Sequence, residues 1–149
     1  MMAHQLYERD FFEWTQCNAA LLRAGRFDQA DIEHIAEEIE DMGRSQRHEL
    51  GSRLRVLLAH LLKWRYQPAL RTRSWTGTIR VQRDELLRLL RQMPSLRPYL
   101  REILPEIYRP AVEQAISETE LPEETFPPAC PFSVDEILEE DFPPDAPRR

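Results

Sequence analysis

A leucine stripe at helical spacing is the feature that most constrains the fold of this chain. Between Ser45 and Tyr66 the apolar side chains recur at steps of three and four residues, the period of one face of an α-helix. The stripe consists of Leu50, Leu54, Leu57, Leu58, Leu61 and Trp64. Pro68 follows it and cannot continue a helix. The pattern predicts a central core helix over residues 45–66.

Other segments repeat the helical period, and none alternates as a strand does. The further predicted helices cover residues 7–24, 28–42, 74–93 and 95–119. Gly25 and Gly43 are expected to end the first two. One side of helix 28–42 carries Ile32, Ile35, Ile39 and Met42, and the opposite side is almost wholly carboxylate. Pro105 and Pro110 predict a kink or a break in the last helix, because each removes an internal hydrogen bond.

The chain changes character at residue 120, where prolines interrupt the helical period. The closely spaced prolines are Pro122, Pro127, Pro128 and Pro131. With Phe126 and Phe132 between them, this segment predicts an extended arm that lies across the helices on aromatic anchors. Ser133 and Glu136 have the spacing of a capping box, which predicts one short helix near residues 134–139.

The predicted fold is therefore all-α. We expect a single domain over residues 1–149, with a bundle of five to six helices at 7–119 and the proline-rich arm, 120–149, packed over it. Helices 45–66 and 74–93 are expected to form an antiparallel hairpin. The apolar fraction of 42% in 149 residues is enough for one continuous core.

Several features predict a cytoplasmic protein. The longest apolar stretch, residues 56–62, falls far short of the roughly 20 residues that a membrane span needs. The N-terminus is polar and acidic, unlike a secretory signal. Cys17 and Cys130 are the only thiols, and such a distant pair is expected to stay reduced.

Basic residues concentrate in the middle of the chain, in a stretch that we call the arginine segment, residues 44–101. It holds 14 of the 20 basic side chains and only three acids, a formal charge of +11, although the whole chain carries −6. All the basic residues except Lys63 are arginines, whose forked guanidinium favours bidentate pairing with carboxylate or phosphate. We expect carboxylates of protein origin to neutralise this segment, within the molecule or across an interface.

The same segment supports a second hypothesis, the binding of RNA or DNA. Its arginines alternate with Trp64, Tyr66 and Trp75, and guanidinium groups beside aromatic faces are typical of phosphate contacts and base stacking. The candidate contacts are Arg71, Arg73, Arg80 and Arg83. Trp75 is also in register with the apolar stripe of its own helix, which favours a place in the core instead.

A metal site is the third hypothesis. If helices 28–42 and 45–66 pack antiparallel, which the short Gly43-Arg44 connection would allow, two imidazoles approach several carboxylates. Helical bundles build di-metal sites from such groups. The candidate ligands are His34, Glu38, Glu49 and His60. No HExxH or paired ExxH signature fixes their geometry, and ion pairs between helices use the same residues. We therefore expect no metal and no cofactor.

Several ordered blocks of the sequence resemble a bacterial family. They include Tyr7-Glu-Arg-Asp-Phe-Phe, Glu33-His-Ile-Ala-Glu-Glu-Ile-Glu-Asp-Met-Gly-Arg-Ser, Leu57-Leu-Ala-His-Leu-Leu-Lys-Trp and Cys130-Pro-Phe. The family is "domain of unknown function 29", and the resemblance covers nearly the whole chain. It implies an all-helical fold, with no established substrate, cofactor or catalytic residue.

The function that these observations favour is that of a non-enzymatic module that binds a protein partner or associates with itself. There is no glycine-flanked serine and no glycine-rich phosphate loop. Asn18 and Gln82 are polar residues at predicted core positions, where we expect hydrogen bonds to satisfy them. An RNA- or DNA-binding protein is the alternative, followed by a metal-dependent hydrolase. We expect no membrane partner.

Overall fold

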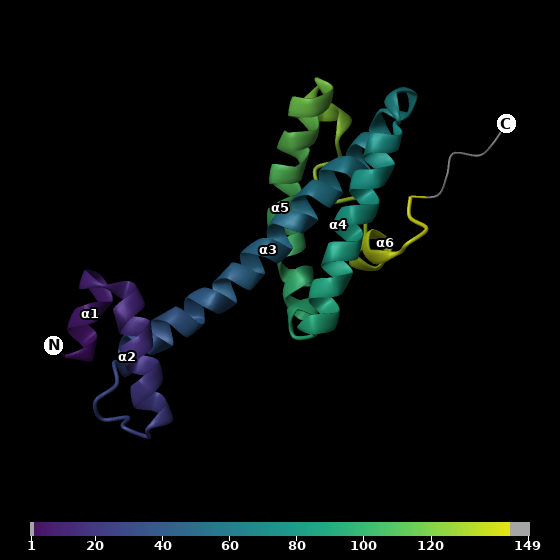
Figure 1. Cartoon of the computed structure of the whole chain (residues 1–149). Coiled ribbons are helices and arrows are strands. Elements are labelled where there is room, and N and C mark those ends of the chain that lie inside the picture. Colours follow the sequence, from purple (N-terminus) through teal and green to yellow (C-terminus); the bar gives the residue numbers. More distant parts are fainter. Residues whose placement is uncertain (1, 144–149) are drawn as a thin grey trace. The chain divides into compact units, whose positions relative to one another are not determined.

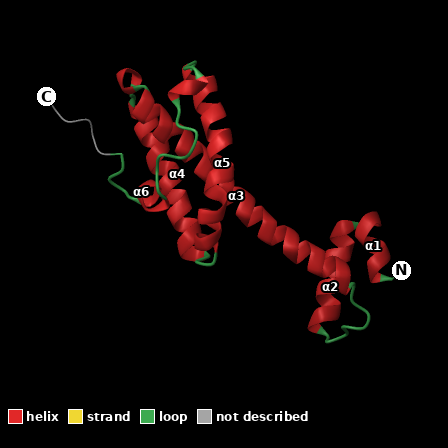
Figure 2. Ribbon diagram, turned by 180° about the vertical axis from the view of Figure 1, so that it is seen from behind, coloured by secondary structure: helices red, strands yellow, loops and turns green. Residues whose placement is uncertain are grey.

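The structure is a computed structural model that describes residues 2–143 (Figure 1). It contains α1 (Ala3–Arg9), α2 (Phe11–Arg23), α3 (Ile32–Tyr66), α4 (Arg73–Gln92), α5 (Leu96–Thr119) and α6 (Val134–Leu138), with 3-10 turns at Pro68–Leu70 and Glu123–Thr125. Over residues 2–143 there is no strand (Figure 2), so the all-α prediction is confirmed. No helix in this range is long and apolar enough for a membrane span.

The chain divides between Gln46 and Arg47 into two compact units, which are described separately below. The N-terminal unit holds α1, α2 and the first turns of α3, and the C-terminal unit holds the rest of α3 with α4, α5 and α6. The expectation of one domain over residues 1–149 stays a prediction.

In the N-terminal unit, the segment predicted as one helix over residues 7–24 is two helices. Asp10 is extended, with a φ of −152°, and its carboxylate accepts a hydrogen bond from the backbone N–H of Glu13 at 3.0 Å. Aspartate is a favoured N-cap, so it begins α2 there. The end of α2 is as predicted, because Gly25 has a φ of +72° and completes a Schellman motif, with hydrogen bonds from Gly25 to Leu22 and from Arg26 to Leu21.

The predicted helix break at Gly43 is wrong, and so is the antiparallel pairing of helices 28–42 and 45–66. The helix α3 begins at Ile32 and continues to Tyr66 without interruption. A glycine inside a helix costs about 1 kcal/mol relative to alanine but ends the helix only where its backbone turns left-handed. Gly43 has no positive φ. Arg44 also supports this turn by pairing with Glu40 and Asp41.

The core of the C-terminal unit is built on the predicted leucine stripe. The leucines of that stripe, Leu50, Leu54, Leu57, Leu58 and Leu61, are at most 1% exposed. After the turn at Pro68–Leu70 the chain runs back, and α4 and α5 lie beside this part of α3 (Figure 1). They add buried side chains such as Leu86 and Leu100 to the same core. The prediction that residues 45–66 form the core helix is confirmed for its buried stripe and its end at Tyr66, but the helix begins earlier, at Ile32.

Both internal prolines are accommodated in α5, which stays a single helix from Leu96 to Thr119. Its buried side chains beyond Pro105 include Tyr108, Ala111 and Ala115, which contribute to the core. The helix ends at Glu120, whose backbone is left-handed with a φ of 61°. Of the two predicted outcomes, a kink or a break, the break does not occur.

The described part of the arm, residues 120–143, contacts the helices through apolar anchors. Phe126, Phe132 and Ile137 belong to the core of the C-terminal unit. The Tyr108 hydroxyl donates a 2.6 Å hydrogen bond to the Pro127 carbonyl. The predicted capping box opens α6, where the side chain of Ser133 and the backbone N–H of Glu136 are 3.1 Å apart. Residues 144–149 of the predicted arm lie outside the described residues.

Candidate functional site

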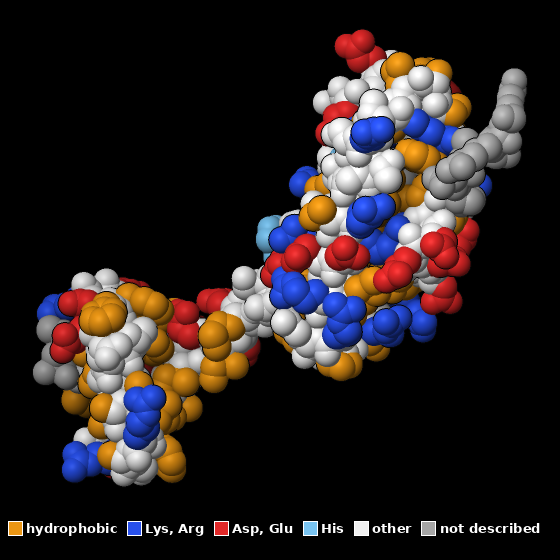
Figure 3. Space-filling view, turned by 45° about the vertical axis from the view of Figure 1, so that its right-hand side comes forward, with side chains coloured by type: hydrophobic (Ala, Val, Ile, Leu, Met, Phe, Trp, Pro, Cys, Tyr) orange, Lys and Arg blue, Asp and Glu red, His pale blue; other side chains and the backbone are white. Residues whose placement is uncertain are grey.

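The arginine segment forms fewer carboxylate pairs than expected. Among residues 2–143, four of its 14 basic side chains lie within 4.0 Å of a carboxylate, namely Arg44, Arg53, Lys63 and Arg88. Within the described chain, carboxylates therefore pair with only a minority of the segment, and neutralisation across an interface stays a prediction. On the face of the C-terminal unit seen in Figure 3, basic and acidic side chains are interspersed. The remaining cations contact carbonyl groups, aromatic rings or solvent.

Arg83 binds the arm and not an acidic side chain. It is 4% exposed, and its guanidinium donates to three backbone carbonyls. Its Nε donates to Ile137 at 2.8 Å, its Nη1 to Glu140 at 3.3 Å, and its Nη2 to Phe142. Burial lowers the pKa of Arg83, while nearby acidic side chains, Asp84 first, oppose that shift. This predicted contact residue is fully engaged inside the protein.

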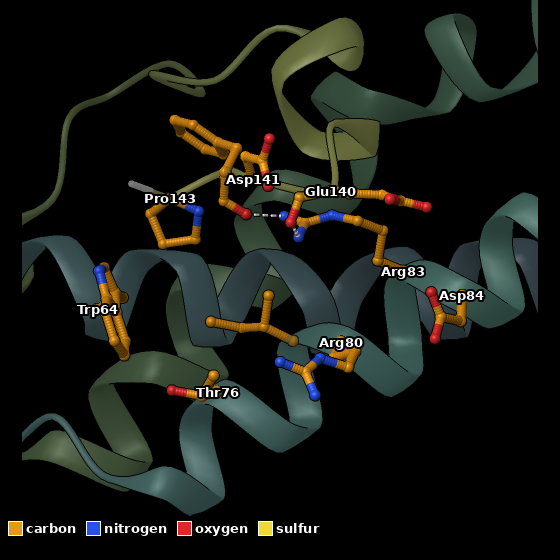
Figure 4. A pocket seen from close by; sticks show the side chains of 10 residues that line it. Trp64, Thr76, Arg80, Arg83, Asp84, Glu140, Asp141 and Pro143 are labelled. Atoms are coloured by element: carbon orange, nitrogen blue, oxygen red, sulfur yellow. Dashed lines mark hydrogen bonds between the residues drawn. The ribbon is translucent and has the colours of Figure 1, made fainter. Parts of the chain in front are cut away.

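A pocket of about 710 Å³ opens beside Arg83 (Figure 4). Its lining consists of Trp64, Thr76, Ile79, Arg80, Arg83, Asp84, Glu140, Asp141, Phe142 and Pro143. The indole Nε1 of Trp64 is buried and has no hydrogen-bond partner among the described atoms. Two cations and three carboxylates line the pocket, so its charge selects neither an anion nor a cation.

The aromatic residues proposed for base stacking are engaged within the protein. The guanidinium of Arg71 lies 4.6 Å from the centre of the Trp64 ring, and its Nε donates to the Trp64 carbonyl at 2.8 Å. The ammonium of Lys63 lies 4.8 Å from the Trp75 ring. Such cation–π contacts cover one face of each ring. Arg73 is exposed at the start of α4, and of the four candidate arginines Arg80 and Arg83 line the same pocket.

The four candidate metal ligands are divided between the two units, and each has another partner. In the N-terminal unit, the Nδ1 of His34 lies 2.6 Å from Asp31, and Glu38 accepts a 2.5 Å hydrogen bond from the Tyr7 hydroxyl. In the C-terminal unit, the Nδ1 of His60 lies 2.9 Å from the Val56 carbonyl. Glu49 pairs with Arg53 and Arg88 at 3.7 and 3.6 Å. Residues 2–143 contain no cluster of three or more His, Cys, Asp or Glu suited to a metal ion.

A buried polar cluster organises the N-terminal unit. Asp31, which is 8% exposed, accepts a 2.9 Å hydrogen bond from the indole Nε1 of Trp14. The Asn18 side chain accepts from the Asp31 backbone N–H at 2.8 Å and donates to the Trp14 carbonyl at 2.9 Å. Asn18 is thus satisfied, as predicted. The cluster joins α2 to the first turn of α3.

The half-buried edge of this polar cluster is a stack of His34 and Tyr7. Their ring centres are 3.8 Å apart and the rings are inclined by 10°. The hydrogen bond to Glu38, helped by burial, raises the pKa of Tyr7 to about 12. Burial opposes the charge on Asp31, but hydrogen bonds from Trp14 and His34 outweigh it and lower its pKa. The cluster therefore joins α1 as well, through the hydrogen bond from Tyr7 to Glu38 and the stack of Tyr7 on His34.

The pKa values of two histidines are expected to be shifted in opposite directions. The hydrogen bond with Asp31 raises the pKa of His34 above its ordinary 6.5, whereas burial lowers the pKa of His60. Because the folded-state pKa of His34 is raised, its contribution to stability is present below pH 6.5 and is lost as the pH rises through the folded value. Titration followed by NMR should separate the two midpoints. In Asp31→Asn the midpoint of His34 should fall while that of His60 stays; coinciding midpoints in the wild type would contradict the assignment.

Large apolar side chains are exposed mainly in the N-terminal unit. Among residues 2–143 ten large hydrophobic side chains are exposed, and eight of them form what we call the apolar set: Met2, Phe11, Phe12, Leu22, Phe27, Ile32, Ile39 and Met42. Figure 3 shows apolar side chains gathered over this unit. Of the apolar residues that the sequence places on one side of helix 28–42, Ile32, Ile39 and Met42 are 51%, 58% and 62% exposed.

The sequence interpretation missed the polar cluster and the apolar set. The signals that could have indicated the cluster were Asn18 inside an apolar stripe and Asp31 three residues before His34. For the apolar set there was no such signal, because an amphipathic pattern shows which face is apolar but not whether another element covers it.

Comparison with known proteins gives one match. A family model described as "Domain of unknown function DUF29" matches residues 6–143. No curated protein and no solved structure matches the chain.

Proposed function

The chain belongs to the DUF29 family, and we propose that it is a non-enzymatic protein-interaction module that associates with itself through its N-terminal unit. One observation carries this proposal. Eight of the ten exposed large hydrophobic side chains of the described chain lie within residues 2–42, less than a third of its length.

Such a concentration of exposed apolar side chains is typical of an interface. Each Phe, Ile or Met that becomes buried contributes about 1.5–3 kcal/mol, so a few of them are enough to hold two molecules together. Phe12, at 73%, is the most exposed of the set. The polar cluster around Asp31 joins α1, α2 and α3, which leaves the apolar set free for an external partner.

The charge distribution favours a second copy of the chain as the partner. The N-terminal unit carries ten acidic and four basic residues, whereas the arginine segment carries +11. Ten basic side chains of that segment have no carboxylate within 4.0 Å among residues 2–143. Complementary charge of this kind directs association and fixes its register.

The double variant Phe12→Ser/Ile39→Ser tests self-association. We expect sedimentation equilibrium to show concentration-dependent association of the wild-type chain, weakened about tenfold or more in the variant because two apolar contacts are lost. Leu70→Ser/Val81→Ser is the matched control, since it removes the two exposed hydrophobics of the C-terminal unit and should leave association unchanged. A wild-type chain that stays monomeric at the highest attainable concentration would refute the proposal.

Binding of RNA or DNA is the second candidate, and one observation favours it. Six cations of the arginine segment are exposed and have neither a carboxylate nor an aromatic partner among residues 2–143, so they can meet phosphate: Arg55, Arg73, Arg80, Arg91, Arg97 and Arg101. The engagement of Trp64 and Trp75 by cations of the protein argues against base stacking. Filter binding at increasing salt separates the cases, because phosphate contacts require an affinity that falls steeply with salt.

A further inference from the structure

We propose that the groove between α3 and α5 of the C-terminal unit receives the first turns of α3, Ile32–Met42, from a second copy of the chain. The inference rests on the proposed self-association and names the surface that the N-terminal unit contacts. It makes the contact head-to-tail, since two different surfaces of the chain meet.

The groove is shaped by two parallel rows of side chains at steps of four residues. It has a volume of about 490 Å³, and its lining consists of Arg47, His48, Gly51, Ser52, Arg55, Tyr99, Ile103, Glu106, Ile107 and Pro110. At Gly51 the two helices approach closely, because a Cβ built there would lie 3.4 Å from the Ile107 Cδ1. Apolar groups of α5, chiefly Ile103 and Ile107, line the wall opposite Gly51.

The rim of the groove is basic. Arg47 and Arg55 stand one turn before and one turn after Gly51 on α3, and both are exposed. Neither has a carboxylate within 4.0 Å among residues 2–143. The guanidinium of Arg47 lies 4.6 Å from the Tyr99 ring centre, which holds it at the edge of the groove. The rim carries one acid, Glu106, so an acidic ligand with an apolar centre suits it best.

The first turns of α3 have those properties. Ile32, Ile39 and Met42 recur at helical spacing and are all more than half exposed. Glu33 and Glu40 lie seven residues apart along one edge of this apolar stripe, and both are exposed. Eleven residues of helix span roughly 16 Å, comparable with the roughly 12 Å from Arg47 to Arg55 along α3. The first turns of α3 therefore match the groove in length, apolar character and charge.

A head-to-tail contact predicts that two defective copies can complement each other. The groove variant is Arg47→Glu/Arg55→Glu, and the helix variant is Glu33→Arg/Glu40→Arg. Each alone should associate about tenfold more weakly, because like charges then face each other. An equimolar mixture should recover association, because the acidic groove of one variant meets the basic helix edge of the other.

Sedimentation equilibrium on full-length chains, with circular dichroism to confirm folding, provides the test. Arg97→Glu/Arg101→Glu is the matched control, since it makes the same change in net charge at exposed positions of α5 outside the groove lining and should leave association unchanged. A groove variant that associates like the wild type would overturn this inference and leave the proposed function standing. A mixture that stays as weak as its components would also overturn it. Failure of the proposed function itself would give a different result, namely a wild-type chain that does not associate.

Discussion

Arg83→Met is expected to lower the free energy of unfolding by about 3 kcal/mol, because hydrogen bonds from a charged donor contribute more than neutral ones and the carbonyls left behind lose their donor. Methionine keeps most of the aliphatic volume, so the loss reports on the guanidinium. The guanidinium of Arg83 has three carbonyl acceptors that lie 54 to 59 residues after it in the sequence, in Ile137, Glu140 and Phe142. These hydrogen bonds therefore close a long loop of the chain. Urea denaturation measures the change, and amide exchange in α6 should accelerate most.

Arg80→Met is the matched control for Arg83. Arg80 lies on the same helix and in the same pocket lining, but it is exposed and has no carboxylate within 4.0 Å among residues 2–143. Replacing it should change the free energy of unfolding by less than about 0.5 kcal/mol. Arg83→Lys should fall between the two, because an ammonium keeps the charge but lacks the planar fork. Equal stability of Arg83→Met and the wild type would show that the arm holds without this contact.

The sequence predicts the elements of the C-terminal unit well because their signals are local. The leucine stripe, the stop at Pro68 and the capping box of Ser133 and Glu136 each depend on residues within a few positions of one another. Gly43 shows where this kind of reasoning fails. A glycine has the same sequence signal inside a helix as after its end, and only the surrounding backbone decides between them.

Charge patterning locates the arginines but does not identify their partners. Arg83 binds carbonyl groups, which every residue carries, so no composition signal marks Ile137 or Phe142 as its acceptors. Carboxylates, which the sequence does mark, contact only four cations of the arginine segment in the described chain. Ile39 illustrates the corresponding limit for apolar residues, because its 58% exposure depends on what packs against α3 and not on its helical period.

Asp31→Ala should lower the free energy of unfolding by about 3 kcal/mol, because it removes the acceptor from the buried indole N–H of Trp14 and the charged partner of His34. Asp31→Asn keeps an acceptor for the indole and should cost less. The folded-state pKa of Asp31 is lowered from 3.8, so its charge contributes stability above that value, and the contribution is lost as the pH falls through the folded value. The difference between wild type and Asp31→Ala should therefore shrink in acid.

Asp28→Ala separates this effect from a general loss of negative charge near the start of α3. Asp28 is exposed and lies outside the polar cluster, so its replacement should change stability by less than about 0.5 kcal/mol. Urea denaturation across a pH series measures the free energy of unfolding of both variants, and amide exchange in α2 reports the local effect. If Asp31→Ala and Asp28→Ala were equally stable at neutral pH, the polar cluster would not hold the N-terminal unit together. Because the apolar set is free for a partner only if that cluster holds α1, α2 and α3 by itself, the same result would also remove the structural basis for an interface there.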